Sequence, residues 1–377
     1  MAESFWLSDE AAPLPVRRLG RRPDITVIGA GVTGCACALA LAEAGLRVRV
    51  HEAREVASGA SGRNGGFARW GGAMPYDVAR RQLGPERARD LWLLTERYTS
   101  RMESLAGDAF RRVASLRVAS DVEEREEIRA EYEALRDDGF DAEWLDELPA
   151  PLDGRFYGGM RHPDDGAIHP ARWVRRLARR AVEAGVEIRE RSRVESLDEL
   201  DADQVVLATD GYTHGLIPAL DAAIRPTRGQ MLATEPLRER LFPSPVSTRH
   251  GYIYWQQTPD RRLVIGGFRD ETPDLEYTAV EETTPLVQGH IDAFVVDLIG
   301  ELPPVAQRWS GIFGTTEDQL PLVGQVPGRD GLWVSAGYSG HGNLIGLACG
   351  ELVAHAILGR PAPELALFDP ARVDGIA

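Results

Sequence analysis

Three glycines near the N-terminus, Gly29, Gly31 and Gly34, have the G-x-G-x-x-G spacing of dinucleotide-binding turns. In such a turn the first glycine allows the tight bend, the second lets a pyrophosphate approach the backbone, and the third lets a helix pack closely on a strand. Glu52 follows a second predicted strand, where its carboxylate suits a ribose hydroxyl and would repel the extra phosphate of NADP. A glycine-rich turn without a ligand is the alternative. Strand, turn, helix, strand and acid all occur in order, however, and this favours dinucleotide binding.

A second glycine-rich run lies between residues 59 and 72. Such a density of glycine indicates either a mobile loop or a backbone that lies against something flat and large, and an isoalloxazine ring fits the second interpretation. Arg63 and Asn64 could serve phosphate or ring oxygens, and Arg69 lies just beyond them.

A third glycine-rich turn, GYSGHG at 337–342, follows a predicted strand (332–335) and precedes a predicted helix (343–358). A helix N-terminus aimed at a reduced flavin would stabilise the negative charge near ring atoms N1 and O2. The stabilisation is roughly 0.3–1 kcal/mol when exposed and up to about 2 kcal/mol when buried. His341 in this turn is the best placed of the eight histidines for chemistry.

The elements that position these turns alternate between strands and helices, as in a parallel α/β sheet. Further buried strands are predicted at 25–28, 46–50 and 205–208, whereas 221–310 has the pattern of antiparallel strands and one helix. We therefore expect an α/β fold in which a Rossmann-type FAD-binding domain carries an inserted α+β substrate domain built on a mixed or antiparallel sheet. The expected FAD-binding domain comprises 24–76, 155–220 and 311–377, the substrate domain 77–154 and 221–310, and an N-terminal arm 1–23.

Aromatic residues of the inserted region are candidates for a substrate pocket. In the stretch GYIYWQQ, Tyr252 and Tyr254 share one face of a predicted strand. They would either wall an apolar or cationic pocket or simply pack in the core, and both interpretations stay open.

Composition narrows the function classes. The net charge of −15 argues against nucleic acid and anionic membranes as partners and weakly favours a cationic substrate. All 43 basic residues are arginine, which excludes Schiff-base chemistry on lysine. Cys35, Cys37 and Cys349 have no metal-site spacing and are expected to be packing residues of a reducing compartment. The sequence has no secretory signal and no long apolar run, so a cytoplasmic location is expected.

With these motifs together, the chain resembles the D-amino-acid oxidase superfamily of FAD-dependent amine and amino-acid oxidoreductases, which includes glycine oxidase and monomeric sarcosine oxidase. The resemblance rests on the first glycine motif with Glu52, on GASGRNGG (59–66) and on GYSGHG (337–342). The N-terminal WL…P pattern and the last two motifs look most like the gamma-glutamylputrescine oxidase group within it.

The resemblance implies roles for individual residues around a bound FAD. Glu52 would hold the adenosine ribose, Arg54 and residues 60–66 would line the pyrophosphate and the ring, and the backbone of Val194 would meet the adenine. Residues 340–343 would lie beneath the flavin pyrimidine. The candidate cofactor-binding residues are Gly29, Gly31, Val32, Thr33, Gly34, Glu52, Ala53, Arg54, Ala60, Ser61, Arg63, Asn64, Gly65, Gly66, Val194, Ala208, Thr209, Gly340, His341, Gly342 and Asn343.

Departures from the family pattern concern the substrate and the attachment of the flavin. Phe313 stands where glycine oxidase has an arginine that grips the substrate carboxylate, and Val264 stands where sarcosine oxidase has a lysine that activates oxygen. Gly311 aligns approximately with the cysteine that anchors flavin in sarcosine oxidase, and 61–67 contains no histidine, so we expect noncovalent FAD and no metal.

The implied reaction removes a hydride from the carbon beside an amine nitrogen and delivers it to flavin N5, after which water hydrolyses the imine. Candidate catalytic residues are His341, Tyr254 and Arg69, and Tyr252 and Phe313 would line the substrate pocket. We expect a primary or secondary amine as substrate and oxygen or another electron acceptor as partner. The alternatives are an amino-acid oxidase or dehydrogenase of the glycine or sarcosine type, a non-catalytic flavin-binding subunit of a larger complex, and an NAD-only dehydrogenase.

Overall fold

A six-stranded sheet carries the first glycine motif, and its central strands are buried on both faces. The computed structural model describes residues 3–9, 12–373 and 375–376. Five strands of this sheet run parallel and the edge strand β16 is antiparallel. The order is β16 (Leu322–Gln325), β17 (Leu332–Ala336), β10 (Gln204–Leu207), β1 (Ile25–Ile28), β2 (Val48–His51) and β9 (Glu187–Arg189).

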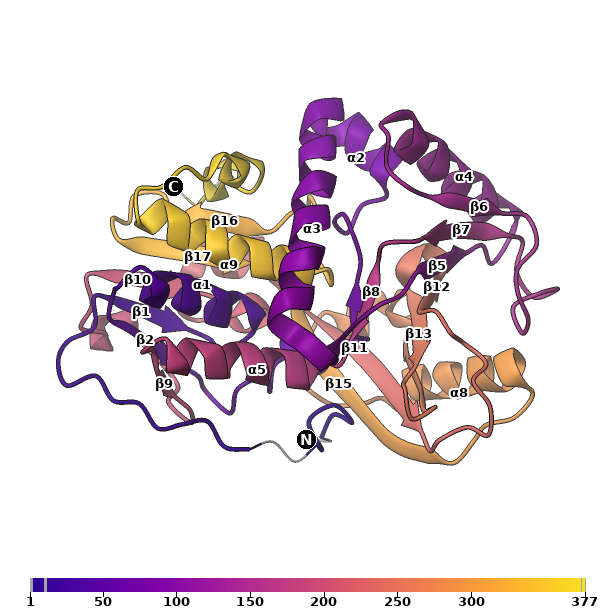
Figure 1. Cartoon of the computed structure of the whole chain (residues 1–377), viewed down its shortest axis with the longest axis horizontal. Coiled ribbons are helices and arrows are strands. Elements are labelled where there is room, and N and C mark those ends of the chain that lie inside the picture. The colour runs from indigo at the N-terminus through magenta and orange to yellow at the C-terminus, as the bar shows by residue number, and fades with distance from the viewer. Residues whose placement is uncertain (1–2, 10–11, 374, 377) are drawn as a thin grey trace.

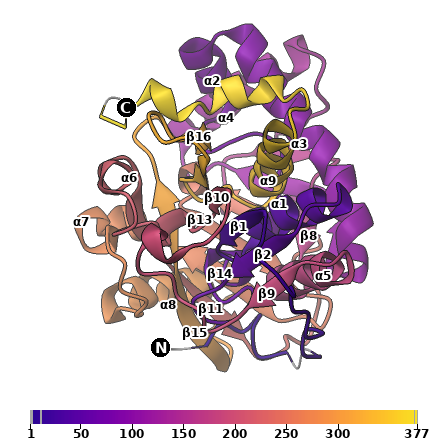
Figure 2. The same cartoon turned by 90° about the vertical axis from the view of Figure 1, so that its left-hand side faces the viewer.

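Helices cover one face of this sheet (Figure 1). α1 (Val32–Glu43) packs between α5 (Pro170–Glu183) and α9 (Leu344–Ile357), and the view in Figure 2 shows α1 and α9 side by side. Because neighbouring strand residues point to opposite faces, Val27 joins the large core beneath these helices, whereas Ile28 joins a smaller cluster on the other face.

An eight-stranded mixed sheet forms the second part of the molecule, at the right of Figure 1. Only the β12–β5 pair is parallel among its described pairs, and α8 (Pro285–Ile299) packs on β11 and β14. Its order is β15 (Val305–Thr315), β11 (Arg225–Thr234), β14 (Leu263–Gly267), β13 (Ile253–Gln257), β12 (Val246–Thr248), β5 (Ser115–Val118), β7 (Gly159–His162) and β6 (Glu143–Leu145).

A three-stranded sheet and shorter helices complete the fold. The sheet has the order β3 (Phe67–Ala68), β8 (Gly166–Ile168), β4 (Phe110–Arg112). The other α-helices are α2 (Tyr76–Leu83), α3 (Pro85–Ala106), α4 (Val122–Asp137), α6 (Pro218–Ala223) and α7 (Pro273–Glu276). Short 3₁₀ turns lie at η1 (Ala60–Gly62), η2 (Gly107–Ala109), η3 (Leu197–Glu199), η4 (Asp210–Tyr212), η5 (Arg249–Gly251), η6 (Arg269–Glu271), η7 (Pro363–Leu367) and η8 (Pro370–Arg372).

The expected fold class is confirmed, because a Rossmann-type sheet is joined to a second, mixed sheet. The ranges expected for the substrate domain are too short for that second sheet. β7 lies beyond residue 154, and β15 continues past residue 310, because both strands pair along their whole length with strands of the eight-stranded sheet. The division into two domains remains our proposal.

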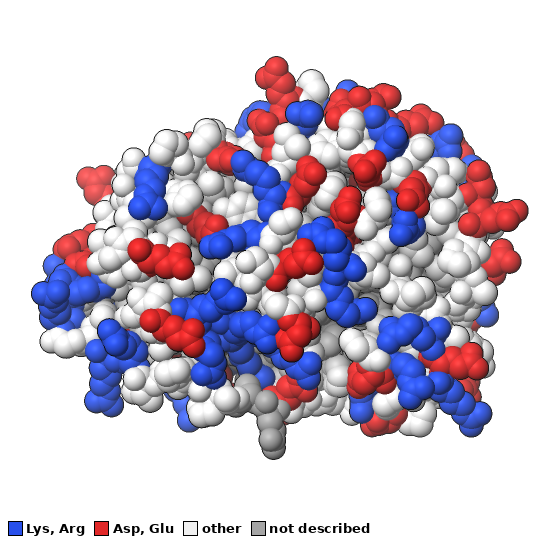
Figure 3. Space-filling model, in the orientation of Figure 1, with Lys and Arg blue, Asp and Glu red and all other residues white. Residues whose placement is uncertain are grey.

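The face shown in Figure 3 and the described helices bear on the charge of the surface and on membrane spanning. Acidic and basic side chains are interspersed over the face shown in Figure 3. Among the described residues, no helix combines the length and the apolar character needed to span a bilayer, and no cluster of His, Cys, Asp or Glu could hold a metal ion.

Candidate active site

The turn between β1 and α1 requires glycine at two positions. Gly29 has a φ of +103°, and a Cβ atom there would lie 2.5 Å from the carbonyl oxygen of Ala208. A Cβ atom on Gly34 would lie only 1.9 Å from the carbonyl oxygen of Gly29. Both contacts are too short for any side chain, so the glycines allow α1 to approach β1 and let β1 approach the end of β10.

The three glycine-rich segments meet around one cavity of about 700 Å³, which we call the inner cavity. Its wall includes every candidate cofactor-binding residue except Gly34 and Gly66, which pack behind it. A Cβ atom on Gly66 would clash with the side chain of Gln256 and the backbone of Ile168. Segments separated by some 300 residues therefore converge on a single site, as expected for an α/β sheet that binds ligands at the carboxyl ends of its strands.

Glu52 is held at one end of the inner cavity by the backbone. Its carboxylate accepts hydrogen bonds from the N–H groups of Ala30 and Arg54, each at 2.9 Å. The acceptor is thus fixed beside the glycine turn, where a ribose hydroxyl can donate to it.

Two arginines lie close to Glu281 in the wall of the inner cavity. Glu281 was not identified as a site residue from the sequence. Glu281 pairs with Arg54 at 2.7 Å, lies 3.7 Å from Arg63, and accepts a hydrogen bond from Tyr212. Burial opposes ionisation of Glu281, but the hydrogen bonds from Arg54 and Tyr212 outweigh burial and lower its pKa. Two arginines against one carboxylate leave this wall suited to a pyrophosphate.

At the other end, the turn at 337–342 and the start of α9 line the inner cavity. Asn343 is the N-cap residue of α9 but makes no capping hydrogen bond with its side chain, whose amide instead donates to the carbonyl of Phe67 at 2.7 Å. The Asn343 and Asn64 amides also hydrogen-bond to each other at 3.3 Å. The second and third glycine-rich segments are thereby joined, with the positive end of the α9 dipole at the cavity.

A larger outer cavity of about 2030 Å³ adjoins the inner one. We call the residues that line both cavities the junction: they are Arg69, Gly251, Arg269, Phe313, Ser339 and His341. Two of the three candidate catalytic residues, Arg69 and His341, lie at this junction. Tyr254 lines only the inner cavity, where its ring packs edge-on against Phe67 at 6.0 Å.

Arg269 lies between Tyr252 and Phe313, the two residues that the sequence analysis placed in the substrate pocket. Its guanidinium carbon is 4.3 Å from the ring centre of Tyr252 and 5.6 Å from that of Phe313. Tyr252 precedes strand β13, so the expectation that Tyr252 and Tyr254 share one face of a strand is wrong, and the two side chains line different cavities. The cation between Tyr252 and Phe313 belongs to the protein itself.

The two junction arginines keep most of their donors available. Within the described part of the chain, the Arg269 guanidinium donates no hydrogen bond and joins no ion pair. Arg69 donates to the hydroxyl of Ser247 at 3.2 Å. Burial lowers the pKa of Arg69, and the charge of Asp165 partly offsets that effect. A planar guanidinium with free donors can bind a carboxylate through two hydrogen bonds.

Comparison with known proteins identifies the family. The model of a family described as FAD dependent oxidoreductase (DAO) matches residues 24–356. The chain belongs to the DAO family of FAD-dependent oxidoreductases.

This DAO protein is similar to several characterised or named oxidoreductases. It is 28% identical to the probable oxidoreductase OrdL of Rhizobium meliloti, over 97% of this chain and 89% of the relative. It is 27% identical to the gamma-glutamylputrescine oxidoreductase of Escherichia coli, over 89% of this chain and 84% of the relative. Its fold matches the crystal structure of glycine oxidase from Geobacillus kaustophilus with a TM-score of 0.79 and 23% identity, covering 94% of this chain and 100% of the other. The resemblance, the enzyme class and the FAD cofactor predicted from sequence are confirmed.

The inner cavity of this DAO protein fits FAD. It presents an acceptor for a ribose at Glu52, arginines for the pyrophosphate, and the N-terminus of α9 for the ring. The three cysteines are buried and none lines the cavity, which supports noncovalent attachment.

Asp210 is another residue of the site that sequence reasoning missed. Its carboxylate accepts from the backbone N–H groups of Gly314 at 3.0 Å, Gly337 at 2.8 Å and Tyr338 at 3.3 Å. It therefore ties the end of β10 to β15 and to the turn before α9. The small polar residues after the predicted strand at 205–208 were the one signal in the sequence that pointed to it.

His341 should make the stability of this DAO protein depend on pH. Burial lowers its pKa to about 4, and the charges of Arg69 and Arg269 act in the same direction, so the folded imidazole is neutral at pH 7. The unfolded chain takes up a proton below about pH 6.5 while the folded one does not, so stability falls between pH 6.5 and 4.

The variant His341→Gln should lose less stability than the wild type between pH 7 and pH 5, by on the order of 1–2 kcal/mol in urea unfolding. His214→Gln is the control, because His214 is 75% exposed. An identical pH dependence in wild type and His341→Gln would contradict this prediction.

Proposed function

We propose that this DAO protein oxidises the C–N bond of a small amine that also carries a carboxylate, giving an imine that water hydrolyses. The observation that carries the proposal is the Arg269 guanidinium, which lies against Tyr252 and Phe313 at the junction of the two cavities and forms no hydrogen bond or ion pair with any described residue. The names of similar proteins agree with it, since they include glycine oxidase, iminodiacetate oxidase and L-proline dehydrogenase.

The residues around the junction would have separate roles in binding and orienting the substrate. FAD, when bound, supplies the acceptor for the hydride. Arg269 and Arg69 would bind the substrate carboxylate, so that the amine-bearing carbon is presented toward the inner cavity. His341 is neutral at pH 7 and would not repel the amine, and the ring of Phe313 would help to exclude water from the junction.

A simple amine without a carboxylate is the second candidate substrate. Acidic side chains line the outer cavity, including Glu123, Glu126 and Glu127 on the exposed face of α4 and Asp77 on α2. Their charge would attract a cationic amine over a distance of about one Debye length.

A panel of candidate substrates, tested without oxygen, distinguishes the oxidation of carboxylate-bearing amines from the oxidation of simple amines. The holoprotein is mixed with glycine, sarcosine, D-alanine, proline and iminodiacetate, and separately with putrescine-type amines, while flavin absorbance is followed. We expect bleaching by at least one carboxylate-bearing amine, and admission of air then tests oxygen as the acceptor. Bleaching only by simple amines would favour the second candidate, and no bleaching by any compound would favour a non-catalytic flavin-binding subunit.

A further inference from the structure

The first described residues of the chain reach the cofactor site, although they lie outside the region that matches the DAO family. The family match begins at residue 24. Ser4 and Trp6 are nevertheless almost completely buried, with 0% and 1% of their surfaces exposed. Both side chains are therefore packed inside the protein.

Both residues bind the backbone of the second glycine-rich segment. The Ser4 hydroxyl donates to the carbonyl of Gly62 at 3.1 Å, and the Trp6 indole N–H donates to the carbonyl of Asn64 at 2.8 Å. The carbonyl between them, that of Arg63, accepts from the indole N–H of Trp309 on β15 at 2.9 Å. Three consecutive carbonyls are thus held by side chains from distant parts of the sequence.

The held segment is part of the inner-cavity wall. Ser61, Arg63, Asn64 and Gly65 all line that cavity. Asn64 also hydrogen-bonds to Asn343 at the start of α9. A shift of the carbonyls at 62 and 64 would therefore move both the ring-facing segment and its link to α9.

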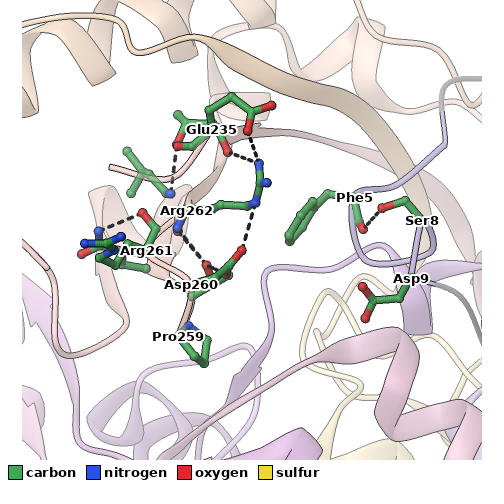
Figure 4. Close-up of polar contacts among 12 residues, drawn as sticks. Phe5, Ser8, Asp9, Glu235, Pro259, Asp260, Arg261 and Arg262 are labelled. Atoms are coloured by element: carbon green, nitrogen blue, oxygen red, sulfur yellow. Dashed lines mark hydrogen bonds and ion pairs between the residues drawn. The ribbon is translucent and has the colours of Figure 1, made fainter. Parts of the chain in front are cut away.

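The arm itself is fixed on its two other sides. Figure 4 shows Phe5 beside Arg262 of the β13–β14 turn, whose guanidinium carbon lies 5.6 Å from the ring centre. Arg262 pairs with Asp260 in the same turn and with Glu235, which follows β11. On the opposite side, Asp9 pairs with His169 at 3.0 Å and with Arg172 at 2.5 Å at the start of α5. The arm is therefore held between the substrate-side sheet and α5.

We propose that Ser4 and Trp6 are positioning residues, which set the backbone of residues 62–64 against bound FAD through two hydrogen bonds. The Ser4 bond is buried and the Trp6 bond is partly buried, so the loss of either donor leaves a carbonyl without its partner. The expected consequence is a looser flavin site in an otherwise folded protein.

The test compares two tryptophan variants of the FAD-loaded, full-length protein. Trp6→Phe keeps an aromatic ring in the core but removes the indole N–H. Trp173→Phe makes the same change at another fully buried tryptophan, whose indole N–H has no hydrogen-bond partner among the described residues. Ser4→Ala removes the second donor with little change in volume.

FAD release after dilution is followed by flavin fluorescence, and the visible spectrum of the bound flavin is recorded. Trp6→Phe and Ser4→Ala should each release FAD about tenfold faster than the wild type and shift the flavin absorption bands, while Trp173→Phe behaves like the wild type. The proposal would be overturned if Trp6→Phe and Ser4→Ala both released FAD at the wild-type rate and both showed the wild-type flavin spectrum. Equal acceleration in Trp6→Phe and Trp173→Phe would overturn it as well, because a general loosening of the core would then be the cause.

Discussion

Replacing Arg269 by leucine should lower kcat/KM for a carboxylate-bearing amine by about 100- to 1000-fold, because a charge-assisted, two-point contact in a partly buried site is lost. Most of the loss should appear in KM if the arginine binds ground state and transition state equally, and in kcat if it aligns the amine. The same variant should oxidise a simple amine at close to the wild-type rate. Steady-state kinetics on both kinds of substrate measure the difference.

Arg225 provides the matched control for Arg269. Its guanidinium carbon also lies over an aromatic ring, 4.6 Å from the centre of Tyr277, and it also lines the outer cavity, but it is not at the junction. Arg225→Leu should change kcat/KM by less than about threefold. Equal losses in the two variants, or an Arg269→Leu enzyme that uses both kinds of substrate normally, would rule out Arg269 as the carboxylate-binding residue.

Replacing Gly34 by alanine should remove FAD from the protein and lower the free energy of unfolding by about 3 kcal/mol or more. The added Cβ atom would lie 1.9 Å from the carbonyl oxygen of Gly29, so α1 must move away from β1 and the phosphate-binding turn must open. The flavin absorbance of the purified protein and its urea unfolding curve report the two effects.

The control is the same substitution in another helix. Gly289 lies in α8, and a Cβ atom there would meet nothing within 4 Å. Gly289→Ala should therefore keep its flavin and gain about 0.5–1 kcal/mol of stability from helix propensity. A yellow, stable Gly34→Ala protein would show that the turn tolerates a side chain.

The parts of the site that could be predicted from sequence are those specified by local spacing. The glycine turn at 29–34, Glu52 and the turn before α9 each carry their signal within a few residues, and a parallel sheet brings such turns to one edge. Arg269 and Glu281 carry no local signal, because their roles depend on which rings and arginines the folded chain brings to them.

The difference between local and long-range signals also explains where the sequence analysis differs from the structure. Tyr252 and Tyr254 were assigned to one strand face because an alternating pattern cannot show where a strand begins, and β13 begins at Ile253. The pairing of β7 with β5 was not predicted, because it joins strands more than 40 residues apart in sequence, which no window of local pattern includes.

Arg269 and Glu281 belong to one connection, the chain between β14 and α8, which therefore contributes to the walls of both cavities. A carboxylate that binds Arg269 and orders this connection would also order Glu281, and with it the Arg54–Glu281 ion pair beside the dinucleotide. If that ordering tightens the binding of the dinucleotide, thermodynamic reciprocity requires the dinucleotide to tighten the binding of the carboxylate by the same factor. An enzyme built this way would retain its prosthetic group best while it is saturated with substrate, and storage buffers containing an unreactive carboxylic acid should slow its inactivation.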